Sequence, residues 1–269
     1  RGGFKKKSLT TLHGYKGLLA FSFCFLIFFI SFLFAVLQML YWTIIFPKHL
    51  IDLDLINLFS NTIILVLLSS IVLISFAFIS NYGNRLSRSK FLEILTTFSI
   101  SGYAIPGIIL AVAFITFISW LDKNIVSLFD IKNIKSIFIG SILGLVIVYF
   151  IRFYSLASNG IKSGYLKISY SIDESAYLLG YSKFKTFKNI HIPYLKNSIL
   201  LIGILISIEV IKELPITLIM RPFNFETFAT QAYIYASQDL LEAAAAPSLF
   251  LILIASFFIL ITSRYILKD

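Results

Sequence analysis

The stretch LFSNTIILVLLSSIVLISFAFI, residues 58–79, carries no charged side chain over its whole length. A helix advances ~1.5 Å per residue, so about 20 apolar residues cross the ~30 Å hydrocarbon core of a bilayer. Five further stretches meet this requirement, and the expected spans are residues 18–42, 58–79, 98–120, 137–153, 198–220 and 246–266. The sequence therefore predicts an all-α integral membrane protein with six transmembrane helices.

Composition supports the membrane interpretation over a soluble one. Of the 269 residues, 58% are hydrophobic and 13% are charged, and the mean hydropathy is +0.91. A soluble helical protein would need a polar face on each helix, whereas these apolar runs are broken only by short polar stretches. The net charge of +10 arises from basic residues in the loops, where anionic lipid headgroups are the expected partners, so we predict no nucleic-acid partner.

The basic residues also predict which side of the membrane each loop faces. Seventeen of the 23 lysines and arginines lie in residues 1–16, in the second and fourth loops, or in the C-terminal tail. Arg85, Arg88, Arg152 and Lys162 are among those assigned to the two loops. Because short cytoplasmic loops hold an excess of these residues, we expect both termini in the cytoplasm.

The N-terminal region is expected to be a cytoplasmic basic arm, residues 1–16, followed by a six-span domain, residues 17–269. The alternative is a cleavable signal peptide, but the apolar run over residues 17–46 exceeds its usual core of about 7 to 15 residues. We therefore expect a retained first span. The chain begins with Arg1 instead of methionine, which indicates a fragment of a longer polypeptide.

Catalytic and cofactor chemistry is not predicted for this chain. The three histidines, His13, His49 and His191, are scattered over the N-terminal arm and two loops on opposite sides, and Cys24 is the sole cysteine. This arrangement favours neither a metal site nor a nucleophile and base pair, so an integral membrane enzyme is disfavoured. The phosphate-binding sequence G-x-x-x-x-G-K-[ST] is absent, so no ATP site is expected.

The fourth loop, residues 158–197, is predicted to form two short cytoplasmic helices. Ser171 and Glu174 have the spacing of a capping box, in which each side chain binds the other residue's backbone amide. Ile172, Ala176 and Leu179 would form one apolar stripe. Gly180 would then end the first helix in a left-handed conformation.

The second short helix is expected to begin at Ser182 and to end before Pro193, which cannot continue a helix. Phe184 and Phe187 would share one face of it. An apolar stripe on an exposed loop needs a surface to bury against, so the pair of helices predicts a protein partner.

The spacing within this loop resembles the EAA loop of binding-protein-dependent ABC permeases. The residues that carry the resemblance are Glu174, Ser175, Ala176, Gly180, Ile190 and Pro193, with serine replacing the first alanine and His191-Ile192 standing before the proline. The resemblance implies a type I ABC importer permease, with a coupling helix that sits in a groove of a separate ATPase. Glu174 and the stripe would then contact the ATPase, which uses the ATP, although Ser171, Glu174 and Gly180 could instead serve only the shape of the loop.

Charged residues inside the fifth span are a second candidate site. Glu209 lies about 16 Å from the start of this span, close to the middle of the bilayer, and Lys212 and Glu213 follow it. Each charge would cost roughly 2.5–3.5 kcal/mol facing lipid, so they should face protein or water. Two interpretations stay open: a translocation pathway that includes Pro215 as a helix break, or an internal ion pair of Glu209 with Lys212.

The run from Glu209 to Thr230 resembles the corresponding region of ferric-iron permeases, and the chain as a whole resembles their C-terminal half. This resemblance implies iron as the solute, a second six-helix half, a periplasmic substrate-binding protein that meets residues 221–245, and the bacterial inner membrane. Thiamine, a polyamine or a phosphonate stay open as solutes, because similar scaffolds serve different cargo. An ATP-independent carrier or channel is disfavoured, because it does not require such a loop and no inverted repeat is visible within the six spans.

Overall fold

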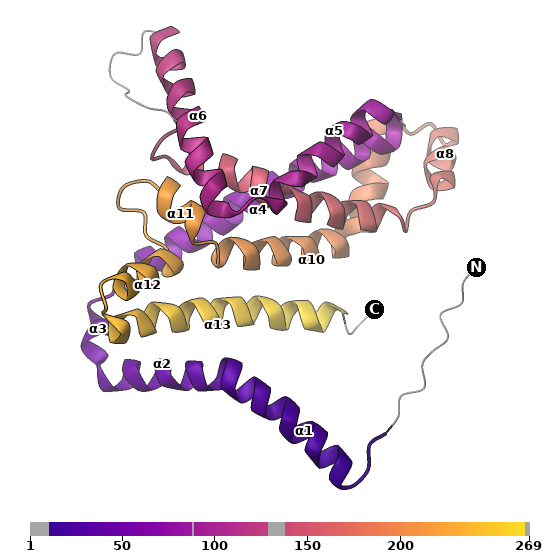
Figure 1. Cartoon of the computed structure of the whole chain (residues 1–269). Coiled ribbons are helices and arrows are strands. Elements are labelled where there is room, and N and C mark those ends of the chain that lie inside the picture. The colour runs from indigo at the N-terminus through magenta and orange to yellow at the C-terminus, as the bar shows by residue number, and fades with distance from the viewer. Residues whose placement is uncertain (1–10, 88, 129–137, 267–269) are drawn as a thin grey trace.

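The computed structural model describes residues 11–87, 89–128 and 138–266, and within these ranges it contains helices and no strand (Figure 1). The described residues leave out most of the N-terminal arm and the expected start of the fourth span at residue 137. They also leave out Arg88, Lys132 and Lys135. The helices are α1 (Tyr15–Phe28), α2 (Phe34–Ile45), α3 (Pro47–Ile51), α4 (Leu55–Ser87), α5 (Lys90–Ile100), α6 (Gly107–Leu128), α7 (Ile142–Tyr165), α8 (Tyr170–Leu178), α9 (Lys183–Thr186), α10 (Ile192–Ile211), α11 (Pro215–Met220), α12 (Phe228–Ser237) and α13 (Leu241–Ile266).

Within the described residues, six helical segments are long and apolar enough to cross a membrane, in agreement with the predicted number of spans. They are Tyr15–Ile45, Leu55–Ser87, Gly107–Ile125, Ile142–Tyr165, Lys183–Ile211 and Leu241–Arg264. The first joins α1 to α2 through the π-helical turn Phe29–Leu33, and the fifth joins α9 to α10 through the π-helical turn Phe187–His191.

Three expected spans are wrong in their bounds. The fifth runs over Lys183–Ile211 instead of residues 198–220. The third begins at Gly107 instead of residue 98, because the 3₁₀ turn Ser101–Ala104 and Pro106 separate α5 from α6. Proline lacks an amide hydrogen and disfavours helical backbone at the residue before it, so the chain changes direction there. As a result, α6 leaves the bundle at a steep angle to α10 and α13 (Figure 1). The fourth span extends to Tyr165 instead of ending at Phe153, so Arg152 and Lys162 belong to a helix and not to a loop.

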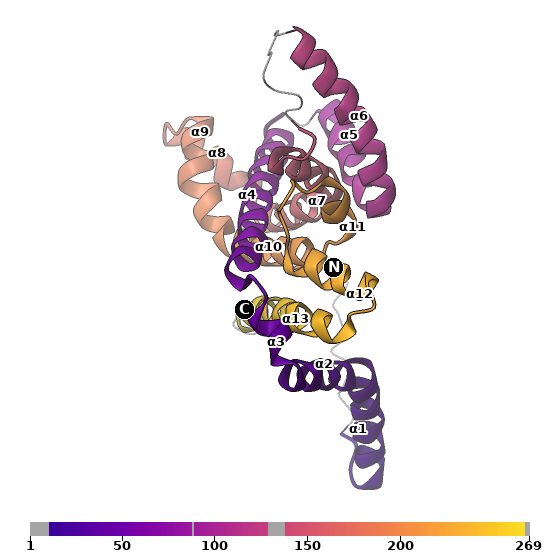
Figure 2. The same ribbon diagram turned by 90° about the vertical axis from the view of Figure 1, so that its left-hand side faces the viewer.

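The core lies where α4, α7 and α10 pack together. Leu73 and Ala77 of α4, Tyr149 and Phe153 of α7, and Ile206 of α10 are each at most 1% exposed. Helix α13 packs against α10 on one side and α2 on the other, and Figure 2 shows these three helices nearly end-on as successive layers. No residue of α1 or α2 is buried, so the first span presents its apolar surface outward.

Candidate functional site

The connection between α7 and α10, residues 166–191 and called the elbow below, folds back on itself. Helices α8 and α9 of the elbow lie together at one end of the bundle, where α4, α7 and α10 also meet (Figure 1). Two short helices were expected here. The first is present as α8, whereas the second, α9, continues into α10. The elbow therefore offers a helical surface held on three spans.

The predicted capping box at the start of α8 is wrong. The N-cap is Ser169, whose hydroxyl accepts a hydrogen bond from the amide of Ser171 at 3.3 Å. Ser171 lies inside the first turn, with its hydroxyl 2.7 Å from that of Ser169. The helix begins earlier because the Arg85 guanidinium binds the carbonyls of Ile168 and Ser169 and fixes the chain at that point.

The predicted apolar stripe is correct for two of its three members. Ile172 is half-buried against the core and Ala176 is 3% exposed. Leu179 is 79% exposed and does not belong to the stripe, because α8 ends at Leu178 and the backbone of Leu179 has left the helical conformation. The stripe thus attaches α8 to its own bundle, where Ile172 and Ala176 are not open to the ATPase that the resemblance implied as their partner.

The outer face of α8 is where a partner could bind. Glu174 and Ser175 are exposed there, and Leu178 and Leu179 at its end are 89% and 79% exposed. Phe184 of the next helix is 73% exposed. Large apolar side chains beside exposed charged residues form the kind of surface that another protein covers.

The turn after α8 has the predicted form. Gly180 has φ of 79°, in the left-handed region that glycine adopts without a steric penalty. Its amide bonds the carbonyl of Tyr177 at 3.0 Å, and the Tyr181 amide bonds that of Ala176 at 3.0 Å. These bonds close the end of α8 and redirect the chain into α9.

The start of the second helix is predicted correctly, but its end is wrong. Ser182 is the N-cap of α9 and accepts from the amide of Lys185 at 3.3 Å. Pro193 does not stop the helix, which runs on through the π-helical turn Phe187–His191 into α10. The wider turn directly before Pro193 accommodates the lost hydrogen bond, and proline is tolerated in the first turn of α10. Ile190 is half-buried and Pro193 is exposed.

A buried ionic cluster behind α8 was missed by sequence reasoning. Asp173 Oδ2 lies 2.7 Å from Nε of Arg85, and its Oδ1 lies 2.7 Å from Nε2 of His191. The three side chains are 10%, 7% and 0% exposed, respectively. They come from α8, α4 and the π-helical turn before α10, so nothing in their sequence spacing indicated the contact. The available signal was Asp173 itself, a charged residue on the inward face of the predicted stripe.

Glu209 and Lys212 form the predicted ion pair within the fifth span. Lys212 Nζ lies 2.7 Å from Oε1 of Glu209, and the side chains are 55% and 23% exposed, respectively. Lys212 also lines a small cavity of about 400 Å³ between α2, α12 and α13. A role of either residue in translocation stays a prediction.

Glu213 lies at a break in the fifth span and is bound to Arg152. Helix α10 ends at Ile211 and α11 begins at Pro215, so the expected interruption at Pro215 is present. Glu213 Oε2 lies 3.3 Å from Nε of Arg152, and Arg152 also donates to the carbonyl of Ile105 at 2.6 Å. This geometry favours an internal ion pair for Glu213. Through its two bonds, Arg152 connects the chain just before α6 with the chain just before α11.

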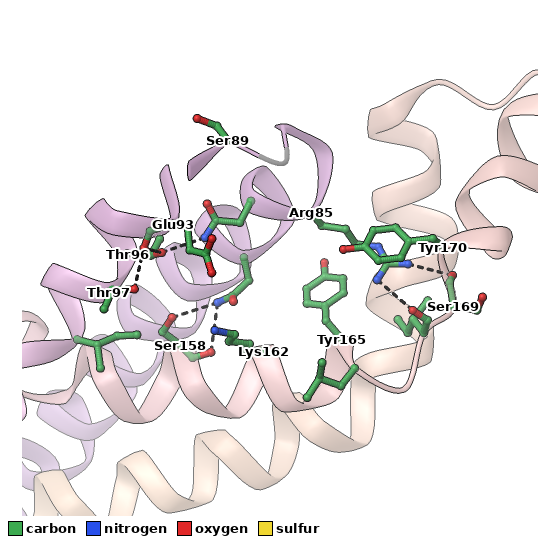
Figure 3. Close-up of a pocket in the computed structure, with 15 residues that line it drawn as sticks. Arg85, Ser89, Glu93, Thr96, Thr97, Ser158, Lys162, Tyr165, Ser169 and Tyr170 are labelled. Carbon is green, nitrogen blue, oxygen red and sulfur yellow. Dashed lines mark hydrogen bonds between the residues drawn. The ribbon is translucent and has the colours of Figure 1, made fainter. Parts of the chain in front are cut away.

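A polar cavity of about 650 Å³ lies beside the elbow, between α4, α5 and α7 (Figure 3). Glu93, Thr96 and Thr97 line it from α5, and Lys162 lines it from α7. Figure 3 shows Arg85 at its border with the start of α8. Arg85 therefore belongs both to the lining of this cavity and to the ionic cluster.

The expected external loop, residues 221–245, is mostly helical. It contains α12 and the first turn of α13, and Ala243 and Ala245 are 1% and 2% exposed, so only part of it is open to a partner. Phe223 is 94% exposed, next to an ion pair of Arg221 with Glu226. Burial lowers the pKa of the Arg221 guanidinium. Across the described ranges, no group of three or more His, Cys, Asp or Glu residues could hold a metal ion.

In the described part of the chain, six spans and a capped elbow at one end form the fold of an ABC transporter permease. The chain has this fold over almost its full length. It resembles a bacterial ABC transporter involved in the import of the acidic polysaccharide alginate, with a TM-score of 0.69, 17% identity, and coverage of 92% of this chain and 93% of the other. A structure of bacterial alginate ABC transporter in complex with alginate pentasaccharide-bound periplasmic protein gives the same TM-score and coverage at 16% identity.

By sequence, the chain is similar to Fe(3+)-transport system permease protein FbpB 2 of Haemophilus influenzae. The two are 21% identical over 267 residues, which is 96% of this chain and 49% of the relative. The chain thus spans about half the length of the curated relative that it matches. No protein-family model matches the chain.

Proposed function

We propose that this chain is the transmembrane permease subunit, or one permease half, of an ABC importer in a bacterial inner membrane. A separate ATPase would bind the elbow and drive solute translocation through the spans. The observation that carries the proposal is the exposed outer face of α8, where Leu178 and Leu179 stand free while Ile172 and Ala176 hold the helix on the bundle. An ATP-independent carrier or channel has no need for such a surface.

The proposed solute is ferric iron. Its support is the likeness to an iron-transport permease along 96% of this chain and the resemblance of residues 209–230 to iron permeases. The structural neighbours come from an alginate importer, but a likeness at 16–17% identity concerns the fold and not the cargo. Thiamine, a polyamine and a phosphonate are the other solutes that the test must include.

The proposed assembly contains ATPase subunits, a second six-helix half and a periplasmic substrate-binding protein. The second half belongs to the same polypeptide or to a partner copy, as the twofold length of the sequence relative suggests. Lipid would cover the apolar surface of α1 and α2, where no residue is buried. In the proposed assembly the elbow and both termini face the cytoplasm, where the ATPase lies.

Uptake of radioactive ferric iron tests the proposal. Cells would carry the full-length permease with its ATPase and binding protein, and matched cells would lack the ATPase. We expect uptake only in the complete system, and no competition from thiamine, spermidine or a phosphonate. If one of those solutes is taken up instead of iron, the iron assignment is wrong, and uptake without the ATPase would overturn the permease proposal itself.

A further inference from the structure

Helix α4 contacts the elbow at the start of α8, at the start of α9 and at the π-helical turn before α10, although it is distant from the elbow in sequence. Its Tyr82 hydroxyl donates to the carbonyl of Lys183 at the start of α9 at 2.6 Å. Phe187 of the following π-helical turn packs on the rings of Phe78 and Tyr82, with centroids 5.1 and 4.8 Å apart. The C-terminal part of α4 is therefore the surface on which the elbow is built.

Arg85, in the last turn of α4, binds the start of α8 through three separate bonds. Besides Asp173, its guanidinium donates to the carbonyls of Ile168 and Ser169 at 3.0 and 2.9 Å. The same group lies 4.3 Å from the centre of the Tyr170 ring. The planar fork of arginine matches this set of acceptors, and a lysine ammonium would not reach all of them in one geometry.

The Asp173 carboxylate extends this connection to α10. One oxygen accepts from Arg85 and the other lies on His191, whose side chain is fully buried directly before α10 begins. Charge-assisted bonds between buried groups are stronger than neutral ones. Loss of one charge would leave the other buried without its partner. The cluster thus ties α4, α8 and α10 at one point.

We propose that Arg85 and Asp173 are positioning residues that fasten α8 to α4 and to the start of α10. The elbow and the adjoining end of α4 then move as one body, so α4 transmits movement of the ATPase to the bundle. Helix α8 alone is nine residues long, or about 13 Å, and without the fastening its loops would absorb that movement. This inference rests on the proposed function, because it names the span through which the ATPase acts.

The test compares solute transport with ATP hydrolysis in the same vesicles. The full-length permease would be reconstituted with its ATPase and binding protein, as wild type and as Arg85→Lys, Arg85→Gln and Asp173→Asn. We expect ATP hydrolysis to persist while solute moved per ATP falls about tenfold, equal to about 1.4 kcal/mol of lost coupling. Arg264→Gln is the matched control, because it removes an exposed positive charge from the end of α13 and should leave the ratio unchanged.

Two further measurements distinguish loss of the connection between α4 and α8 from a general loss of folding. The double variant Arg85→Gln with Asp173→Asn should lose no more of the ratio than either single variant, because both changes remove the same connection. Hydrogen exchange of the assembled transporter should become faster in α8 of Arg85→Lys than in α7 or α10. If Arg85→Gln does not assemble, Arg85→Lys and Asp173→Asn still decide the outcome.

The fastening is overturned if Arg85→Lys and Asp173→Asn both move solute per ATP within about twofold of wild type and the hydrogen exchange of α8 is unchanged. If wild-type vesicles hydrolyse ATP without moving any solute tested, or move solute without ATP, the proposed function fails instead. The two failures are distinguishable because only the second appears in the wild type.

Discussion

Replacing Glu213 with glutamine should destabilise the chain much more than the same change at Glu209. The Glu213 side chain is 9% exposed, lies 3.3 Å from Nε of Arg152 and accepts the Ile216 amide at 3.4 Å. Glutamine keeps the size but removes the charge. Arg152 would retain only the carbonyl of Ile105 as a strong partner.

The size of the effect follows from the distance and the exposure. Two unit charges 3.3 Å apart attract by about 5 kcal/mol at an effective dielectric constant of about 20. Because the Arg152 side chain is 20% exposed and keeps one bond, we expect a net loss of about 2 kcal/mol. For a chain of this size, that loss lowers the melting temperature by about 4–8 °C. The Glu209 pair should lose only about 0.5 kcal/mol, since its Lys212 side chain is 55% exposed.

Thermal unfolding of the detergent-solubilised protein measures this difference. Glu209→Gln is the control for loss of a carboxylate charge from the same span. The double variant Arg152→Met with Glu213→Gln should recover part of the loss, because no charge is then left buried alone. If Glu213→Gln and Glu209→Gln melt within about 2 °C of each other, the internal role of Glu213 is refuted.

Three other substitutions test local features of the fold. Gly102→Ala should lower stability by about 1–3 kcal/mol in thermal unfolding, because its Cβ would collide with the backbone oxygen of Ile151, whereas Gly83→Ala enters open space in α4 and should not lower it. Gly180→Ala should cost about 1 kcal/mol from its positive φ alone, since nothing lies within 4 Å of the added carbon, and faster proteolysis of the elbow would show it. Ser182→Ala removes the N-cap of α9 at a cost of about 1 kcal/mol, and unchanged hydrogen exchange at the Lys185 amide would contradict that role.

The number of spans and the interruption at Pro215 could be predicted from the sequence, but the exact ends of the spans could not be placed. Long apolar runs identify a span whatever its partners, because the bilayer selects for length and hydropathy. Residues 98–100 are as apolar as the helix that follows Pro106, so the two read as one span. Pro106 is the sequence signal of this break, whereas the packing of Gly102 against Ile151 joins segments distant in sequence and leaves no such signal.

Local chemistry at the candidate site was predictable where it depends on neighbouring residues. The left-handed Gly180 and the Ser182 cap follow from residue types at fixed offsets. The N-cap of α8 was placed wrongly because Arg85, from a different span, holds Ser169. Partners that lie 88 and 18 positions from Asp173 leave no periodic signal.

Cross-linking at Leu178 tests most directly whether the elbow binds an ATPase. Cys24 is the sole cysteine of the chain, so Cys24→Ser gives a background in which Leu178→Cys carries its one thiol. With a short bifunctional reagent and the assembled transporter, we expect an adduct of the permease with its ATPase at position 178. Phe223→Cys, 94% exposed, should give none, because the segment between α11 and α12 lies at the opposite end of the bundle from α8 (Figure 1). An ATPase adduct at position 223 and none at position 178 would contradict the account.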